Sequence, residues 1–510
     1  MQVNSRTTAF GTAIIVALVV AGCDSGDDSS DAGAGTPASS QPLSAEAPVI
    51  EPVPAAEKPN VVVVYTDDQD AESMAAMPNV NRLLARRGTT FTRAYASTPQ
   101  CCPSRATFLT GQYAHNHGVL DNRPPRGGFE ALDGETTLPV WLSADGYRTA
   151  WVGRYLNQYG APGPDADPTA IPPGWSDWHV PVNRTEFRMY DYELNENGEL
   201  RAYGSEPADY LTDVLAERAN SFVRESAAAE DRFFLVVSPL APHDEGVLER
   251  LKNPPRDPRP APRHDGAFED EPLPRPASFN ERDIADKPSF VTQHPRLGKR
   301  DIARLTRAHR SRLESLLAVD DLVGGLVDEL RTAGVLDETL FIYTSDQGYL
   351  KGEHRLKGKE RVYDPAVHVP LVIRGPGIPA GEARFQPTVS PDLARTIAAA
   401  TGAQPNVALD GVDLRPLARN PAKGSNREIL LEFLSERHFA AVRTRRYAFA
   451  KHQNGETELY DFREDPDQLE NVVADPAYAE VARRLDNELS ELRVCAGTSC
   501  ERETNPGKRR

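Results

Sequence analysis

Two acidic clusters in the sequence have the residue types of a divalent-cation site. Asp67 and Asp68 follow a β-branched apolar run, and this run reads as a buried strand. Asp346 and Gln347 follow a second apolar run far along the chain. Ligands of open α/β sheets bind at the carboxyl ends of the strands, so two such strands in one sheet would bring the clusters together. Calcium and magnesium prefer carboxylate and amide oxygens, and the clusters therefore predict a hard-cation site.

The elements that must position these clusters follow from the apolar pattern. Strands are predicted at residues 61–65, 89–95, 147–152, 233–237, 340–343 and 371–373. Helices are predicted at residues 78–87, 103–111, 208–223 and 302–332. This alternation predicts an α/β fold, a large and mostly parallel sheet flanked by helices. Short strands predict a small antiparallel sheet appended after about residue 421, at residues 429–433, 439–443, 447–451 and 458–460.

The composition excludes several classes of protein. The chain has 510 residues, of which 39% are apolar and 26% charged, so a packed core is available and wholesale disorder is excluded. The net charge of −17 argues against general nucleic-acid binding, because that function needs a basic face. Residues 253–276 combine many prolines with arginines and predict a long surface loop. Asp320 and Asp321 lie in an amphipathic helical pattern and are interpreted as part of a solvated helix face.

The N-terminus has the pattern of an export signal. Arg6 precedes an apolar run at residues 9–20 that is too short to span a bilayer, which predicts a signal peptide over residues 1–22. The letters VAGC that follow resemble the lipobox of bacterial lipoproteins and imply a lipid on Cys23, hence an exported protein anchored to the cell envelope. An ordinary signal peptide with an incidental cysteine is the alternative. Residues 23–58 are rich in small and polar residues and predict a flexible tether.

The most specific segment is CCPSRATFLTG at residues 101–111. It resembles the signature of formylglycine-dependent sulfatases, in which C-x-P-S-R begins a helix that ends in L-T-G. The alternative is a buried structural pair of Cys101 and Cys102. Seven further segments look like N-acetylglucosamine-6-sulfatases and extracellular heparan endosulfatases, at residues 59–70, 113–117, 156–162, 173–175, 209–215, 319–323 and 374–377. The segment at 495–500 matches the end of the glucosamine-6-sulfatases. The resemblance implies the alkaline-phosphatase-like sulfatase fold, with a catalytic domain at 59–420, an antiparallel subdomain at 421–500 and a tail at 501–510.

The resemblance also implies a catalytic site. In this family the first cysteine of the signature, here Cys101, is oxidised to formylglycine by a separate formylglycine-generating enzyme, which is therefore an expected partner. Arg105 is expected to hold the formylglycine, His243 to lie near the leaving oxygen, and Lys359 to grip the sulfate. Calcium is expected to be bound by Asp67, Asp68, Cys101, Asp346 and Gln347.

The chemistry of sulfate esters explains these residue types. A sulfate ester is an anion that resists nucleophiles, so a divalent cation and basic side chains must offset its charge. The hydrate of formylglycine supplies one hydroxyl for attack on sulfur, with Asp346 expected to take its proton, and a second hydroxyl that lets sulfate leave. Arg154 occupies the position at which the family has a lysine. An arginine keeps the positive charge, but its planar guanidinium does not have the geometry of the compact ammonium group of lysine. Asn157 and His354 are the other expected substrate contacts.

The substrate that the resemblance implies is a sulfated sugar similar to glucosamine-6-sulfate. One alternative is a phosphonate or phosphodiester hydrolase of the same superfamily, and another is a non-catalytic glycan-binding lipoprotein on the same scaffold. His115 and His117 lack further zinc ligands and are interpreted as loop residues at the border of the pocket. Cys495 and Cys500 lie close together outside the cytoplasm, which favours a small-loop disulfide, and paired cysteines also close the glucosamine-6-sulfatases.

Overall fold

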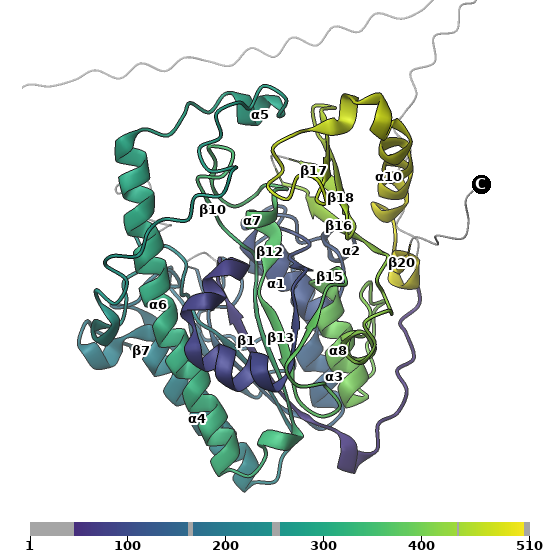
Figure 1. Cartoon of the computed structure of the whole chain (residues 1–510). Helices are drawn as coiled ribbons and strands as arrows, with labels where there is room; N and C mark the ends of the chain where they lie inside the picture. The colour runs from purple at the N-terminus through teal and green to yellow at the C-terminus, as the bar shows by residue number, and fades with distance from the viewer. Residues whose placement is uncertain (1–44, 162–166, 247–255, 436–437, 504–510) are drawn as a thin grey trace, which may run out of the picture. The chain divides into compact units, whose positions relative to one another are not determined.

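A mixed sheet lies at the centre of the fold (Figure 1). The computed structural model describes residues 45–161, 167–246, 256–435 and 438–503. The strands of the central sheet, in spatial order, are β14 (Glu382–Arg384), β2 (Thr89–Phe91), β13 (Leu371–Arg374), β9 (Thr339–Ser345), β1 (Asn60–Thr66), β8 (Phe233–Ser238), β4 (Arg148–Gly153), β5 (Asp177–Pro181), β6 (Glu193–Glu196) and β7 (Glu199–Ala202).

The middle of this sheet is parallel. Strands β9, β1, β8, β4 and β5 run in one direction, and antiparallel pairs occur only toward the two edges of the described sheet. Val62 of β1 lies opposite Leu235 of β8 and Phe341 of β9. Every residue of β1 is buried, as expected for a β-branched strand covered on both faces. The predicted α/β fold is confirmed, and the carboxyl ends of the parallel strands share one edge.

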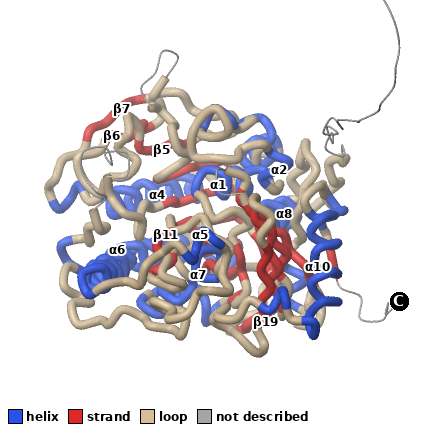
Figure 2. The backbone as a smooth tube through the Cα atoms, turned by 90° about the horizontal axis from the view of Figure 1, so that it is seen from above, coloured by secondary structure: helices blue, strands red, loops and turns tan. Residues whose placement is uncertain are grey.

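Helices cover both faces of the sheet, as the view from above shows (Figure 2). Val61 and Val63 point into the core beneath α1, α3 and α8. The alternating residues Val62 and Val64 point into the core beneath α4 and α6. The helices are α1 (Cys101–Thr110), α2 (Ala114–His117), α3 (Leu138–Ala144), α4 (Leu211–Ala228), α5 (Ser289–Thr292), α6 (Lys299–Thr332), α7 (Asp364–Val367), α8 (Pro391–Thr401), α9 (Leu414–Arg419) and α10 (Ala479–Leu492).

The helix predicted at residues 78–87 is different in the structure. A π-helical turn spans Val80–Leu84 and a 3-10 turn follows at Ala85–Arg87. The carboxylate of Asp320 on α6 accepts hydrogen bonds from the backbone nitrogens of Asn79 (2.9 Å) and Val80 (2.8 Å). The prediction of a solvated face for Asp320 is therefore wrong, because its side chain is buried and satisfies N–H groups at the start of this turn.

The strand predicted at residues 89–95 is also different. It is two short strands, β2 and β3 (Ala94–Tyr95), which belong to separate sheets. Strand β3 pairs with β12 (His368–Val369) and β15 (Thr388–Val389). The chain turns between β2 and β3, where the backbone nitrogen of Thr92 donates to the carbonyl of Arg384. A short hairpin of β10 (Leu350–Lys351) and β11 (Lys357–Gly358) follows the end of β9.

The antiparallel sheet predicted after residue 421 is present. Its strands, in spatial order, are β19 (Thr457–Asp461), β18 (Tyr447–His452), β17 (Phe439–Arg443), β16 (Arg427–Phe433) and β20 (Arg502–Glu503). Helix α10 buries Leu485, Leu489 and Leu492 in the core that it shares with this sheet. The helical spacing of these leucines places them on one face of the helix.

The C-terminal part of the predicted tether, residues 45–58, lies within the described chain. Ile50 is buried, and its backbone exchanges hydrogen bonds with the side chain of Gln404. Ile50 is therefore held against the folded chain, while the other residues of 45–58 are exposed or half-buried. The predicted signal peptide at 1–22 and the lipidation site Cys23 lie outside the described residues. Within the described ranges, no helix is long and apolar enough to cross a membrane.

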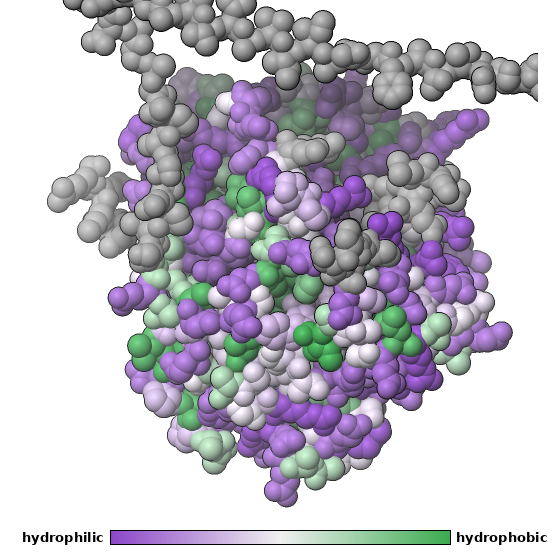
Figure 3. Space-filling view, turned by 180° about the vertical axis from the view of Figure 1, so that it is seen from behind, coloured by the Kyte–Doolittle hydropathy of each residue, from purple (hydrophilic) through white to green (hydrophobic). Residues whose placement is uncertain are grey.

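The surface carries few large apolar side chains. Figure 3 shows one face on which hydrophobic residues occur in small scattered groups among hydrophilic ones. The exposed large hydrophobic residues of the described chain are Val49, Ile171, Leu200, Phe385 and Val494. Isolated exposures of this kind are ordinary and do not mark a docking surface.

Candidate active site

The predicted chemical residues converge at the carboxyl edge of the parallel strands. Asp67 follows β1 directly, Arg154 follows β4, and Asp346 follows β9. Cys101 is the first residue of α1, a helix that ends at Gly111 in a left-handed cap. The sequence pattern of alternating strands and helices therefore places residues from distant parts of the chain in one buried cluster.

The thiol of Cys101 lies among charged side chains. Its Sγ is 2.9 Å from Nζ of Lys359, 3.3 Å from Nε2 of Gln347 and 3.8 Å from Oδ1 of Asp67. The side chain is buried, and neither Cys101 nor Cys102 forms a disulfide. The neighbouring Cys102 lies in the apolar core, where burial raises the pKa of its thiol to about 12. The two adjacent cysteines thus occupy different environments, one polar and one apolar.

Arg105 connects the two acidic clusters. Its Nε donates to Oδ2 of Asp346 at 2.9 Å, and its Nη2 donates to Asp67 at 3.2 Å. The remaining nitrogen, Nη1, donates to the carbonyl of Arg154 and to the hydroxyl of Ser238. The side chain is fully buried, so these charge-assisted bonds hold both carboxylates rigidly in place.

Arg154 is also part of the cluster. Its guanidinium forms an ion pair with Asp67, donates to Oδ1 of Asn157 at 2.9 Å and lies 4.7 Å from the ring centroid of Phe187. The preceding residue, Gly153, has a φ of +114°, and a Cβ built on it would lie 2.1 Å from the carbonyl oxygen of Ser238. Glycine is therefore required there, and this close approach brings Arg154 into the cluster.

Asp68 is the second acidic residue at the end of β1, and it has a strained backbone. Its φ of +67° lies in the left-handed region, which is uncommon for a residue with a side chain. The backbone nitrogen of Asp68 donates to Oδ1 of Asp346, and its carboxylate lies 2.6 Å from Nζ of Lys359. Nε2 of His243 is 3.5 Å from the other carboxylate oxygen. This conformation thus gives Asp68 contacts with three of the predicted site residues.

The electrostatics separate the carboxylates of the cluster. Burial by itself would raise the pKa of Asp67, but the charges of Arg154, His243 and Arg105 outweigh it and hold this pKa below its usual range. Burial raises the pKa of Asp346 well above its usual range, and the charge of Asp67 adds to the effect. Two carboxylates in one site whose pKa values move in opposite directions are typical of catalytic centres.

The donor set fits a divalent cation. Ligand atoms of Asp67, Asp68, Cys101 and His243 lie within 4.8 Å of one another. Oε1 of Gln347 is buried beside them and has no hydrogen-bond partner among the described residues. A buried acceptor without a donor is costly unless a bound group satisfies it. Carboxylate and amide oxygens suit a hard cation such as calcium or magnesium.

His354 occupies a neighbouring cluster. Its Nδ1 lies 2.7 Å from Glu281, and its ring lies 4.3 Å from the ring of Tyr363. The side chain is fully buried, and Nε2 has no hydrogen-bond partner in the described chain. A cavity of about 180 Å³ that it lines also includes Asp70 and Lys351. His354 is therefore near the end of β1 but, in the contacts described, pairs with Glu281 and not with the residues around Cys101.

One positioning residue was missed in the sequence. Arg312 on α6 is buried, donates from Nη1 to the carbonyl of Pro242 and from Nη2 to the carbonyl of Asp68, and lies 4.1 Å from the ring centroid of Tyr349. It therefore supports the segments of both Asp68 and His243. The signal was present, since Arg312 precedes the apolar residues Leu316 and Val319 by four and seven positions on the buried face of the helix.

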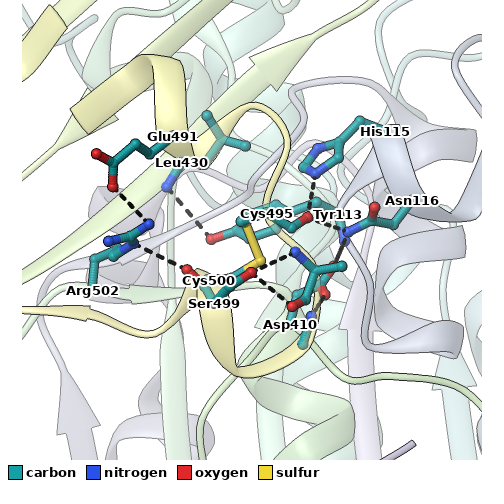
Figure 4. The surroundings of a disulfide bond; sticks show 12 residues. Tyr113, His115, Asn116, Asp410, Leu430, Glu491, Cys495, Ser499, Cys500 and Arg502 are labelled. Carbon is teal, nitrogen blue, oxygen red and sulfur yellow. Dashed lines mark hydrogen bonds and ion pairs between the residues drawn. A yellow bond between two sulfur atoms is a disulfide. The ribbon is translucent and has the colours of Figure 1, made fainter. Parts of the chain in front are cut away.

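His115 and His117 do not belong to this cluster. They lie on the short helix α2, where His115 contacts Glu432 and the carbonyl of Cys495, and His117 contacts Thr107. Figure 4 shows His115 beside the disulfide of Cys495 and Cys500, which confirms that predicted bond. The interpretation of the two histidines as loop residues is therefore wrong, because they are helical, and His115 joins the catalytic region to the C-terminal sheet.

Comparison with known proteins identifies the family of the chain. Residues 59–403 match the sequence model of the family described as Sulfatase, and residues 352–495 match the model described as N-sulphoglucosamine sulphohydrolase, C-terminal. The human N-acetylglucosamine-6-sulfatase is 32% identical and aligns with 87% of this chain and 86% of its own length. An extracellular sulfatase homologue of Caenorhabditis elegans is 37% identical over 70% of this chain, which spans 49% of that relative.

Solved structures share the fold. A protein in complex with its substrate D-glucosamine-2-N,6-O-disulfate superposes with a TM-score of 0.70 at 24% identity, covering 86% of this chain and 97% of the other. The phosphonate monoester hydrolase of Agrobacterium radiobacter superposes with a TM-score of 0.65 at 24% identity, covering 86% of this chain and 96% of the other. Because the family match spans most of the described chain and carries the Cys101 signature, the chain belongs to the sulfatase family.

Proposed function

We propose that the chain hydrolyses the sulfate ester of a sulfated sugar similar to glucosamine-6-sulfate, with Cys101 in its formylglycine form as the nucleophile. The observation that carries the proposal is the polar surrounding of Cys101, whose Sγ lies 2.9 Å from the ammonium of Lys359. The sugar class is supported by the relatives named N-acetylglucosamine-6-sulfatase and by the neighbour bound to a sulfated glucosamine.

Calcium is the cation that we propose for this site. The residues that would hold it are Asp67, Asp68, Asp346, Gln347 and the modified Cys101. The unpartnered Oε1 of Gln347 supports the assignment, because a cation would satisfy this buried oxygen. When bound, calcium would supply positive charge to the sulfate oxygens.

Basic side chains would bind the sulfate and offset the charge that develops on it. Lys359 keeps 16% of its side chain exposed, whereas Arg154 is buried beside it in the same cluster. Arg105 would hold the carboxylates of Asp67 and Asp346 in position. It would not itself contact the substrate, because all of its nitrogens already have partners. Fixed charges of this kind stabilise a transition state without reorganisation during the reaction.

Two side chains would move protons. Asp346 would take a proton from the attacking hydroxyl. Nδ1 of His243 donates to the carbonyl of Asp244 at 2.7 Å, so the imidazolium form would carry its second proton on Nε2 and give that proton to the leaving alcohol. The formylglycine hydrate would supply one hydroxyl for attack and a second for the release of sulfate.

We propose that the protein is exported and anchored to the cell envelope through a lipid on Cys23. The VAGC motif supports this proposal, as do relatives whose names describe extracellular sulfatases. A Cys23→Ser variant is expected to leave the membrane fraction and to retain activity, because no predicted catalytic residue lies before residue 59. Equal retention of wild type and variant in washed membranes would contradict the anchor.

The experiment that tests the function compares the turnover of several substrates. It uses protein in which the mass of the Cys101 peptide has been measured by mass spectrometry. We expect the aldehyde mass, turnover of 6-sulfated glucosamine and of an aryl sulfate, and much slower turnover of an aryl phosphonate. Faster phosphonate turnover would support the alternative of a phosphonate hydrolase on the same scaffold. Glycan binding without any turnover, in protein that carries the aldehyde, would support the non-catalytic alternative.

A further inference from the structure

A basic cavity lies outside the active site, where the C-terminal sheet meets the segment between β2 and β3. Its volume is about 510 Å³, and no acidic side chain is among its lining residues in the described chain. None of the residues around Cys101 lines it. Six of the lining residues are arginines, in a chain whose net charge is −17: Arg93, Arg427, Arg445, Arg446, Arg463 and Arg484.

Three of these arginines form a fixed frame. Arg427 makes two ion-pair contacts with Asp392, at 2.8 and 2.9 Å. Arg446 is paired with Asp461, and Arg484 is paired with Glu428. Each carboxylate partner lies outside the cavity lining, so these pairs hold the guanidinium groups in place without placing negative charge on the cavity wall.

The other three arginines have no strong carboxylate partner. Arg93 donates only to the backbone carbonyl of Arg445 among its described hydrogen bonds. The guanidinium of Arg445 makes no ion pair with the described residues, and Arg463 approaches Glu464 only to 3.7 Å with 74% of its side chain exposed. Burial lowers the pKa of Arg93, and the charges of Arg443 and Arg445 contribute to this effect. Three of the six guanidinium groups therefore lack a close carboxylate partner among the described residues.

Two aromatic rings complete the wall. Tyr447 lies 4.8 Å beneath the guanidinium of Arg446, and Phe462 lies 3.5 Å from that of Arg443. Ligand sites combine apolar surface with a few polar groups, and a volume of about 510 Å³ is within their usual range of roughly 300–1,000 Å³. A single inorganic anion would fill only a part of this space, whereas an anionic sugar segment offers both ring faces and charged groups.

We propose that this arginine cavity binds a second segment of a sulfated oligosaccharide, at a site separate from the one around Cys101. Guanidinium groups match the geometry of sulfate and carboxylate oxygens and bind them bidentately. A concave pocket suits a flexible chain better than a membrane surface, which would need a flat or protruding basic face. Only the choice of a sulfated glycan as the occupant depends on the proposed function.

Binding can be tested without turnover, in the Cys101→Ala background. We expect Arg445→Glu with Arg463→Glu to weaken the binding of a heparin-derived oligosaccharide about tenfold in calorimetry, because two exposed contacts are lost and reversed. The same pair of changes in the Cys101 protein should leave turnover of a small aryl sulfate unchanged. Its KM for a long sulfated chain should increase. The matched control is Arg86→Glu with Arg87→Glu, two exposed arginines outside the cavity lining.

Three outcomes would overturn the proposal. The first is an unchanged oligosaccharide affinity in the cavity variant. The second is an equal loss of affinity in the Arg86/Arg87 control, which would show that only the net charge of the protein matters. The third is loss of binding to phosphatidylglycerol vesicles with oligosaccharide binding intact, which would make the cavity a membrane contact. Failure of the proposed function is a separate result, since it concerns turnover by the Cys101 protein and not affinity in the Cys101→Ala background.

Discussion

The segment from Cys101 to Asn116, which contains α1 and α2, contributes to two polar clusters, one at each of its ends. The first surrounds Cys101 at the start of α1. The second, which we name the junction cluster, consists of Tyr113, His115, Asn116, Asp410, Glu432 and the carbonyl of Cys495. Figure 4 labels all of these residues except Glu432. In the junction cluster, the two oxygens of Asp410 accept from the backbone of Tyr113 and Gly497 and from the side chain of Asn116. No side-chain atom of these residues is among the buried polar atoms that lack a hydrogen-bond partner in the described chain.

The Cys101 cluster is satisfied less completely. Oε1 of Gln347 and Nε of Arg154 have no hydrogen-bond partner among the described residues, although both are buried. Asp68 also has a strained backbone. Unsatisfied atoms and strain reduce stability and persist where a ligand compensates for them. The comparison teaches that burial and charge alone do not distinguish the two clusters, whereas unsatisfied buried atoms together with a strained backbone do.

The largest expected effect tests the Cys101 side of this comparison. Cys101→Ala should lower sulfate release by at least about 10³-fold, because it removes the nucleophile. The thermal midpoint should change little, since the thiol is not part of the satisfied core. Cys101→Ser should release sulfate once at best. Turnover and the unfolding midpoint of purified variants are the measurements, and near-native turnover of the alanine variant would refute the mechanism.

Arg154 is expected to have the next largest effect. Arg154→Ala should lower kcat/KM on 6-sulfated glucosamine. The expected loss of transition-state stabilisation is about 3–4 kcal/mol, the usual cost of one lost electrostatic contact. Arg154→Lys should lose less, because it restores the charge but not the planar fork. The matched control is Arg201→Ala, an arginine that is 60% exposed on β7. An alanine variant that retains its kinetics on both sugar and aryl sulfates would assign Arg154 a purely structural role.

The pH dependence of stability tests the junction cluster. Burial would lower the pKa of His115, but the hydrogen bond and charge of Glu432 outweigh it and raise this pKa to about 9. Because the folded value exceeds the unfolded one, the contribution is complete below pH ~6.5 and is lost as pH increases through about 9. The stability difference between wild type and His115→Gln should therefore shrink by on the order of 3 kcal/mol over that interval.

Denaturant titrations at pH 6.5, 7.5 and 9 would measure this difference. Burial raises the pKa of Asp410 to about 6, so its contribution to stability changes with pH mainly below pH 6 and is nearly constant over the interval. His264→Gln is the matched control, because the ion pair of His264 with Asp321 lies at the surface. A pH-independent difference between wild type and His115→Gln would show that His115 is not charged in the folded protein.

The disulfide should have the smallest effect. Replacing Cys495 and Cys500 by alanine removes a closed loop with a sequence separation of only 5, for which the chain-entropy estimate is about 2 kcal/mol. The midpoint of unfolding should decrease, while kcat of the folded enzyme should not change, because the bond supports only the junction cluster. A drop in kcat at temperatures well below the midpoint would mean that the two clusters are coupled.

Most of the fold and much of the site could be predicted from the sequence. The strands at β1, β8, β9 and β13 and the long helix α6 follow directly from apolar runs and helical periodicity. The signature at residues 101–111 indicates the family, and the acidic residues after β1 and β9 follow from the strand-end rule. The prediction failed for Asp320, whose role depends on a backbone turn more than two hundred residues away in sequence.

The sequence by itself determined which residues could do chemistry and on which type of element each one lies. Only the tertiary structure decided their partners. It paired His115 with Glu432, and His354 with Glu281, and it brought Arg312 beneath the segments of Asp68 and His243. Residue types and periodicity are local properties, whereas ion pairs join segments that come together only when the sheet forms. The physical reason is that a buried charge must find its compensation in space, and sequence distance does not constrain where that compensation lies.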